Sequence, residues 1–282
     1  LAFDIEVASK IRIPDAKTDP IVMISFYGED YQKVICSSNF KNPPSYVEFA
    51  ENEAELLLRF KEIVKEYNPD YLVGYFSDGF DFPYIRARAQ KYRIKLDLGK
   101  DGSPVKFSRG ADAGTVKIVG IAHIDIYKFL RRVMIARLGI SSLDLHSVAT
   151  HLIGEGKVKS VDIGGLYEAI ESKEKPLTSF CEYNLQDSRV TYKVTLAMLP
   201  HLHEFVKLVG LPIDDVCRMS YGRLVESYLL RQIRQFKEVA PNRPSGREMN
   251  KRDYESYVGA FVHEPVTGLH KDLVVFDFKS LY

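Results

Sequence analysis

The sequence has little of three features that would narrow its class at once: cysteine, long apolar runs and an excess of one charge. Its three cysteines lie far apart with no C-x-x-C pair, which argues against a disulfide framework or a zinc knuckle. No apolar run approaches the ~20 residues of a membrane span. The 39 Lys+Arg and 38 Asp+Glu leave a net charge of +1, which excludes a wholly basic DNA-coating protein and an acidic disordered tail.

The composition is that of a globular protein. The 282 residues are 45% hydrophobic and 27% charged, enough for one large or two ordinary domains with real cores. The first residues lack the basic-then-apolar pattern of a signal peptide, so we expect an intracellular protein with no membrane association and reduced thiols at Cys36, Cys181 and Cys217.

The order of short apolar runs and periodic segments predicts an α/β fold. Three runs at the amino end are expected to form an antiparallel meander, and a helix stopped by Asn68-Pro69 follows. The pattern then breaks near 200–212. The predicted strands are 1–7, 21–28, 32–38, 71–76, 123–126 and 273–278, with a hairpin over 105–119, and the predicted helices are 52–67, 82–92, 143–152, 179–198 and 216–236.

Two carboxylates lie close together in the first predicted strand, Phe3-Asp4-Ile5-Glu6. Residues two apart in a strand share a face, so Asp4 and Glu6 point the same way while Phe3 and Ile5 pack into the core. Like charges at this spacing are tolerated when they are solvated at an edge or when divalent cations neutralise them. The pair alone fits either a surface strand or a metal site.

A second acidic element follows the strand 71–76, where Asp81 begins a predicted helix among aromatic residues. An aspartate at a helix start is often an N-cap. Aromatic side chains beside an acidic site also suit single-stranded nucleic acid, because every base offers a face for stacking. Phe76 either closes the core at the strand end or stacks on a base.

The third element is Tyr183-Asn184-Leu185-Gln186-Asp187. Spacing i, i+4 puts Tyr183 and Asp187 on one helical face. Alone this element resembles an exposed helical turn. Together, Asp4, Glu6, Asp81 and Asp187 can hold two Mg²⁺ or Mn²⁺ ions for phosphodiester hydrolysis, since oxygen ligands suit these hard ions.

On these residues the sequence resembles a family B DNA polymerase, from its 3'-5' exonuclease domain to the start of its palm. FDIE at 3–6, FDFPYI at 80–85 and YNLQD at 183–187 resemble the three exonuclease motifs. YVGAFV at 257–262 resembles the Tyr-x-Gly-Gly linker motif, and DFKSLY at 277–282 resembles the first polymerase motif. Five motifs in family order span essentially the whole chain.

The resemblance implies a ribonuclease H-like α/β fold with a mixed sheet and flanking helices for residues 1–205. Residues 206–282 would be a linker helix and part of an α+β palm. It also implies that Asp4 bridges two ions, that Glu6 and Asp187 complete the site of the ion activating the attacking water, and that Asp81 serves the second ion. Tyr183 would orient the nucleophile.

Further roles are implied by the other motifs. Phe80, Arg86, Tyr257 and Gly259 would contact DNA, as would Phe76 where it stacks. In the full-length polymerase Asp277 would bind the catalytic ions, and Tyr282 would abut the nucleotide sugar. The hairpin resembles a strand-separating hairpin that some family members carry.

Two positions depart from the family pattern. Phe76 stands where the second exonuclease motif usually has Asn, so a polar contact near the primer end is lost. Ala260 replaces the second Gly of the linker motif and restricts the backbone there.

The sequence therefore predicts a metal-dependent 3'-5' proofreading exonuclease acting on single-stranded or frayed primer DNA. Its partners would be primer-template DNA, the remaining polymerase domains and a sliding clamp contacted by other parts of the protein. No polymerisation is expected from these residues alone. The alternative is a catalytically weakened domain that binds single-stranded DNA and scaffolds the polymerase.

Overall fold

The computed structural model describes residues 1–11, 13–108, 114–155, 165–172, 177–242, 244–254 and 264–276. It divides into two compact units, Leu1–Lys237 and Glu238–Tyr282. In the second unit, α10 (Gly246–Tyr254) is followed by exposed, irregular chain over 264–276. Within the described residues, no helix is both long enough and apolar enough to cross a membrane.

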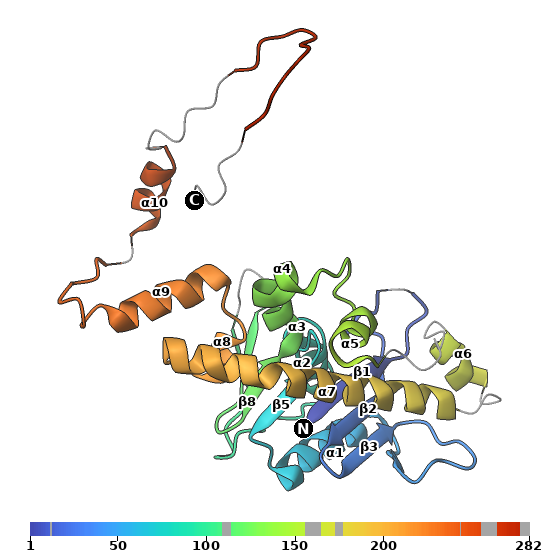
Figure 1. Cartoon of the computed structure of the whole chain (residues 1–282). Helices are drawn as coiled ribbons and strands as arrows, with labels where there is room; N and C mark the ends of the chain where they lie inside the picture. The colour runs from blue at the N-terminus through green and yellow to red at the C-terminus, as the bar shows by residue number, and fades with distance from the viewer. Residues whose placement is uncertain are drawn as a thin grey trace. The chain divides into compact units, whose positions relative to one another are not determined.

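A six-stranded mixed sheet forms the centre of the first unit, in the order β4-β3-β2-β1-β5-β8 (Figure 1). β1, β2 and β3 are an antiparallel meander, whereas β5 and β8 run parallel to β1. This arrangement confirms the predicted ribonuclease H-like α/β fold. The strands are β1 (Ala2–Val7), β2 (Ile21–Gly28), β3 (Tyr31–Cys36), β4 (Val47–Phe49), β5 (Tyr71–Gly74) and β8 (Ala122–Asp125).

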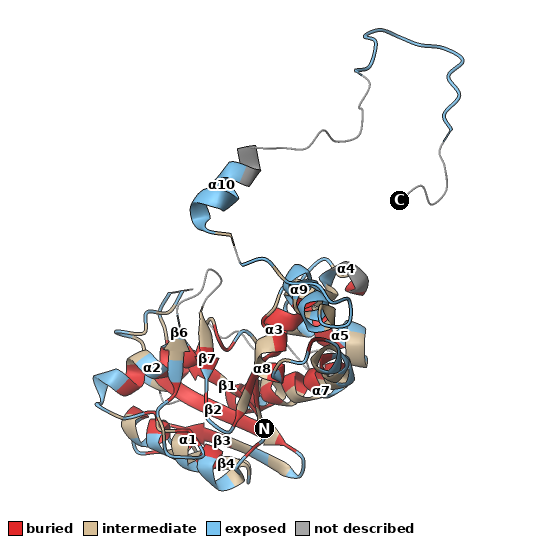
Figure 2. Cartoon of the chain, turned by 90° about the vertical axis from the view of Figure 1, so that its left-hand side faces the viewer, coloured by how far each residue is buried: buried red, intermediate tan, exposed pale blue. Residues whose placement is uncertain are grey.

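β1 lies inside the sheet, with β2 on one side and β5 on the other. Phe3 and Ile5 pack into the core beneath α1 (Glu53–Tyr67) and α2 (Asp81–Lys91). Ala2 packs into a second core against the opposite layer, so the residues of β1 alternate between the faces. Burial of the inner strands is visible as red ribbon in Figure 2.

The two ends and the buried face of helix α1 follow local rules that can be recognised in the sequence. Asn52 caps its start by accepting a hydrogen bond from the Glu55 backbone N–H, and Asn68 ends it in the left-handed conformation. Leu56, Phe60 and their neighbours on the same face are fully buried. The prediction of a helix over 52–67 is confirmed.

The opposite face of the sheet is covered mainly by α7 (Thr178–Val209), a helix of 32 residues that packs on β1, β2, β3 and β5 (Figure 1). α5 (Leu145–Ile153) and α9 (Tyr221–Gln232) pack against it. The remaining helical segments are α3 (Ile126–Phe129), the π-helix η1 (Leu130–Met134), α4 (Ile135–Leu138), α6 (Gly165–Ser172) and α8 (Ile213–Val216).

A separate two-stranded hairpin, β6 (Lys106–Ser108) and β7 (Thr115–Lys117), confirms the hairpin prediction over 105–119. Its strands pair with each other and form their own sheet. The residues at its tip, 109–113, are outside the described ranges.

Three predicted features differ in the structure. The break expected near 200–212 is absent up to Val209, because α7 continues through Pro200. Pro200 and Leu196 are both exposed, so water can satisfy the Leu196 carbonyl that loses its helical donor. The helix expected at 216–236 is interrupted between α8 and α9, and residues 273–276 form no strand.

The boundary proposed at 205/206 falls within α7, whereas the compact unit extends to Lys237. A single helix carries the chain across that position because its apolar residues, such as Leu202 and Val209, continue the second core.

Candidate active site

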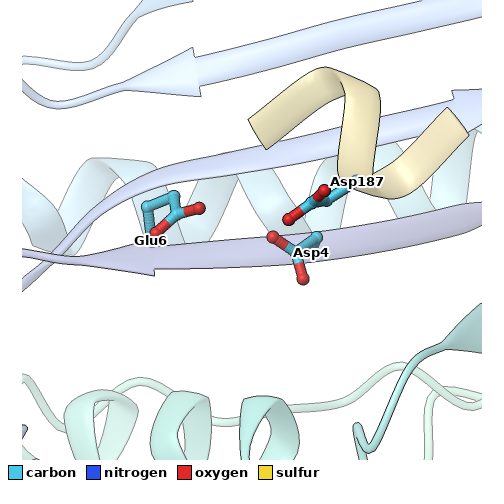
Figure 3. Close-up of side chains that lie close together, drawn as sticks. All are labelled: Asp4, Glu6 and Asp187. Atoms are coloured by element: carbon cyan, nitrogen blue, oxygen red, sulfur yellow. The ribbon is translucent and has the colours of Figure 1, made fainter. Parts of the chain in front are cut away.

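Three carboxylates converge where α7 crosses β1. One carboxylate oxygen from each of Asp4, Glu6 and Asp187 lies within 4.8 Å of the other two (Figure 3). Asp4 and Glu6 share one face of β1, as the strand pattern predicts, and Asp187 reaches them from a helix about 180 residues later in the chain.

Hydrogen bonds between α7 and β2 fix the position of Asp187. Ser25, which pairs with Asp4 across the two strands, donates its hydroxyl hydrogen to the Asn184 carbonyl at 2.8 Å. The hydroxyls of Ser25 and Ser188 are 2.5 Å apart. These small buried side chains let the helix backbone approach the sheet, so one turn of α7 lies directly over the carboxylates.

The side chains next to Asp187 in the same helix also face the cluster. Asn184 is fully buried and donates from Nδ2 to Asp4 Oδ2 at 2.8 Å. The hydroxyl of Tyr183 is hydrogen-bonded to Asp187, and burial raises the pKa of Tyr183, helped by the charge of Asp187. Sequence reasoning missed the role of Asn184, since no local pattern shows which face of the helix it takes.

The cluster is electrostatically strained without a cation. Burial raises the pKa of Asp4 well above its usual range, and the neighbouring charges of Asp81, Glu6 and Asp187 raise it further. A set of oxygen donors this close together fits a hard divalent cation, which removes the repulsion that otherwise favours protonation.

Asp81 lies beside this group without being part of it. It is the first residue of α2, only 3% exposed, and its charge acts on Asp4. Burial raises the pKa of Asp81 to about 7, while a hydrogen bond from the Ile5 backbone lowers it. Phe80, not Asp81, occupies the N-cap position.

The turn that brings Asp81 to the site is held by a buried aspartate that the sequence did not single out. Asp125, at the end of β8, accepts hydrogen bonds from the backbone N–H groups of Phe76 and Asp78, both at 3.0 Å. Asp125 is fully buried, and burial raises its pKa.

Phe76 is not a core residue. Its side chain is 38% exposed and its backbone is left-handed, with φ of 62°. The ring contacts Tyr127, with 5.1 Å between centroids, and lies so close to Gly79 that a side chain at that position would have to displace it.

Some of the predicted DNA-contact residues lie in the described part of the chain and others do not. Phe80 is half-buried against Tyr84, and Arg86 is exposed with its guanidinium 4.6 Å from the Phe107 ring centroid. Arg88, two residues later in the same helix, is buried in an ion pair with Glu53. Tyr257, Gly259, Asp277 and Tyr282 lie outside the described residues.

Two models of known protein families match parts of this chain. A family model described as "DNA polymerase family B, exonuclease domain" matches residues 1–148, and one described as "DNA polymerase family B" matches 211–282. The chain belongs to DNA polymerase family B. The predicted resemblance is thereby confirmed.

Relatives of this chain include DNA polymerases of archaea. It is 40% identical to the DNA polymerase of Pyrococcus glycovorans over its whole length, covering 35% of that protein, and 38% identical to DNA polymerase 1 of Pyrococcus abyssi over 93% of its length, covering 33%. The solved family B DNA polymerase of Pyrobaculum calidifontis matches 86% of the chain with 28% identity and a TM-score of 0.71, covering 30% of that structure. The chain thus spans about a third of these relatives.

The match to the exonuclease family model ends at residue 148, before Tyr183 and Asp187. The proximity of Asp187 to Asp4 and Glu6 is therefore known from the fold, in which α7 brings Asp187 back to β1. The chain holds the exonuclease domain of a family B DNA polymerase.

Proposed function

We propose that this chain is the 3'-5' proofreading exonuclease part of a DNA-directed DNA polymerase. It hydrolyses the terminal phosphodiester of a single-stranded or frayed primer. The observation that carries the proposal is the convergence of Asp4, Glu6 and Asp187 within 4.8 Å. Unpaired ends are favoured because a mismatched terminus costs less to unpair than a matched one.

Asp4, Glu6 and Asp187 would hold a divalent cation, and Asp81, next to Asp4, would help to hold a second. Two Mg²⁺ or Mn²⁺ ions, when bound, supply positive charge that stabilises the attacking and leaving oxygens of the reaction. The acidic site needs this charge, since four carboxylates otherwise repel the DNA phosphates.

The protein's own groups orient the reactants. Tyr183, which is hydrogen-bonded to Asp187, would orient the attacking water. Asn184 fixes the rotamer of Asp4 through its 2.8 Å hydrogen bond. The water oxygen bonds to phosphorus as the bond to the 3' oxygen breaks, and the products are a nucleoside 5'-monophosphate and a new 3'-hydroxyl.

The test is digestion of a 5'-labelled single-stranded oligonucleotide with Mg²⁺ or Mn²⁺. We expect a ladder that shortens from the 3' end and is absent in EDTA. Asp4→Ala should abolish cleavage with the fold retained by circular dichroism, as should Asp4→Ala combined with Glu6→Ala. Unchanged nuclease activity in Asp4→Ala would refute the assignment.

A second candidate function is a silent scaffold that binds single-stranded DNA. It is favoured by the half-exposed Phe76 ring beside Tyr127, which offers an aromatic surface for base stacking. DNA binding without cleavage, both in this chain and in the full-length polymerase, would support it. Cleavage by the full-length polymerase alone would instead show that the exonuclease requires its other domains.

The substrates and partners of the whole protein are part of the same proposal. These are primer-template DNA and the other polymerase domains, with a sliding clamp contacted elsewhere in the protein. The family model matching 211–282 supports a continuation into polymerase domains.

A further inference from the structure

A buried cluster of charges lies three residues before Asp81 and has no part in the chemistry described above. Its centre is Asp78, which is 1% exposed. Asp78 accepts hydrogen bonds from Lys128 at 2.9 Å and from Arg218 Nε and Nη2 at 2.7 and 3.1 Å. His123 Nδ1 is 3.4 Å from the same carboxylate.

Such a cluster is costly to bury, because each ion loses its hydration and is stable only when its hydrogen bonds are complete. Here the carboxylate of Asp78 and the cationic groups of Lys128 and Arg218 all have hydrogen-bond partners. Burial alone would raise the pKa of Asp78, but the neighbouring His123 and the hydrogen bonds from Arg218 hold it well below its usual range. Asp78 therefore stays ionised, opposite Lys128 and Arg218.

The side chains of this cluster form hydrogen bonds with the backbone of the hairpin. The Val116 N–H donates to Asp78 at 2.9 Å, and the Val116 carbonyl accepts from Arg218 Nη2 at 3.0 Å. Lys128 donates to the carbonyl of Gly114 at 2.5 Å. In the described residues β6 and β7 form no ladder with the main sheet, so these bonds hold the hairpin backbone together with the buried side chains of Val105, Val116 and Ile118.

The same strand is also tied to the segment after α7. Lys117 pairs with Asp215 at 2.6 Å and with Asp214 at 3.6 Å. Asp214, Asp215 and Arg218 all belong to the part of the chain that matches the general polymerase family model, whereas the hairpin belongs to the exonuclease part. The two parts therefore meet at β7.

The hairpin faces α2 across a cavity of about 670 Å³. Arg86 and Gln90 line it from α2, and Phe107, Ser108 and Thr115 line it from the hairpin. The guanidinium of Arg86, which lies over the Phe107 ring, suits a phosphate. The aromatic ring and the hydroxyl and amide groups around it suit a base. The helix that forms one wall begins at Asp81, so the cavity lies along the same element as the proposed active site.

We propose that Arg218 is a positioning residue. Through Asp78 it holds the β6–β7 hairpin as one wall of a cavity that takes an unpaired nucleotide of DNA. The positioning part stands on the hydrogen bonds above, and the choice of DNA as ligand rests on the proposed function. Loss of Arg218 should release the Val116 carbonyl, mobilise the hairpin and weaken DNA binding.

The experiment compares the 282-residue chain with Arg218→Met and, as a matched control, Arg223→Met. Arg223 is exposed on α9, so its loss removes the same charge without touching the cluster. Hydrogen exchange should accelerate at least tenfold in residues 106–108 and 114–117 of Arg218→Met and stay unchanged in β2 and β3. Neither change is expected in Arg223→Met, and Arg218→Lys should restore part of the protection.

Affinity for a fluorescein-labelled single-stranded oligonucleotide is measured in EDTA, where no cleavage occurs. We expect the Kd of Arg218→Met to rise about tenfold relative to Arg223→Met. Unchanged exchange in 106–108 and 114–117 would overturn the positioning role. If Arg218→Met exchanges faster but binds the oligonucleotide as tightly as Arg223→Met does, the cavity is not a DNA-binding site. This conclusion does not depend on the result of the nuclease assay.

If Arg218→Met fails to fold because Asp78 loses its main partner, the double variant Asp78→Asn/Arg218→Met decides the matter. It removes the buried negative charge together with the cation. The same two measurements, with the same expected changes, then apply to that variant.

Discussion

Phe76 adopts a left-handed backbone that costs a non-glycine residue about 1–2 kcal/mol, and Asn is among the few residues that tolerate it well. Its ring makes an aromatic contact with Tyr127 but remains 38% exposed. The substitution of the family's usual Asn therefore changes both backbone strain and the chemistry of the surface leading to Asp81.

We predict that Phe76→Asn raises the exonuclease rate and changes the free energy of unfolding by no more than about 1 kcal/mol, because relief of strain offsets the lost ring contact. Phe76→Ala is the control, since it removes the ring without adding an amide. Single-turnover digestion of a labelled oligonucleotide measures the rate. An equal or lower rate in Phe76→Asn would show that Phe76 has a structural role.

Single residues also show which side-chain contacts can be predicted from the sequence and which cannot. The alternation of β1 is local, so the shared face of Asp4 and Glu6 followed from spacing alone. The sequence predicts that Asp187 joins them from the chemistry of four carboxylates and from the family resemblance, because no periodicity relates residues so far apart in the chain. Arg218 and Asp78 escaped notice for the same reason: they are 140 residues apart and meet only in the folded chain.

At the scale of elements, α1 and α2 are joined by a buried ion pair. Arg88 Nε and Nη2 donate to Glu53 at 2.6 and 2.5 Å, and the hydroxyl of Tyr92 donates to the same carboxylate at 2.9 Å. Glu53 also accepts from the Ile21 backbone at the start of β2. The pair thus connects both helices to the sheet.

We predict that Arg88→Met lowers the free energy of unfolding by about 3–5 kcal/mol, since it leaves the carboxylate of Glu53 buried without its cation. Gln90→Met, on the exposed face of the same helix, should change it by less than about 0.5 kcal/mol. Urea unfolding followed by circular dichroism gives both values. Similar midpoints for the two variants would contradict the importance of the pair.

The elements that were predicted correctly have strong local signals, namely alternation or apolar runs in the strands and capping with an apolar face in α1. The continuation of α7 through Pro200 has no such signal, because it depends on Leu202 and Val209 packing into the second core. Tertiary packing there outweighs the local cost of proline.

For the whole molecule, the acidic site links stability to pH and to divalent cations. Burial raises the pKa of Asp4 and brings that of Asp81 to about 7, whereas an unfolded chain has values near 4. The metal-free folded protein therefore retains protons that the unfolded chain releases. Its stability is greatest below about pH 4 with respect to these groups and falls as pH rises through about 7.

We predict that Mg²⁺ raises the Tm more at pH 8 than at pH 6, because the carboxylates must lose their protons to bind the ion. At a hundredfold excess over Kd the increase at pH 8 should be about 5–10 °C. Thermal unfolding in Mg²⁺ and in EDTA measures it, and Asp4→Ala/Glu6→Ala should show no increase. Equal increases at both pH values would argue against ligands with raised pKa.

The unbroken course of α7 links two distant parts of the first unit. Between Asp187 and Val209 the helix spans about 33 Å at 1.5 Å per residue. It is held along this length, because Val194, Leu202 and Val209 pack into the second core. A shift of the whole helix would have to break that packing as well as the serine contacts to β2, so the position of Asp187 is coupled to the packing at the far end of α7.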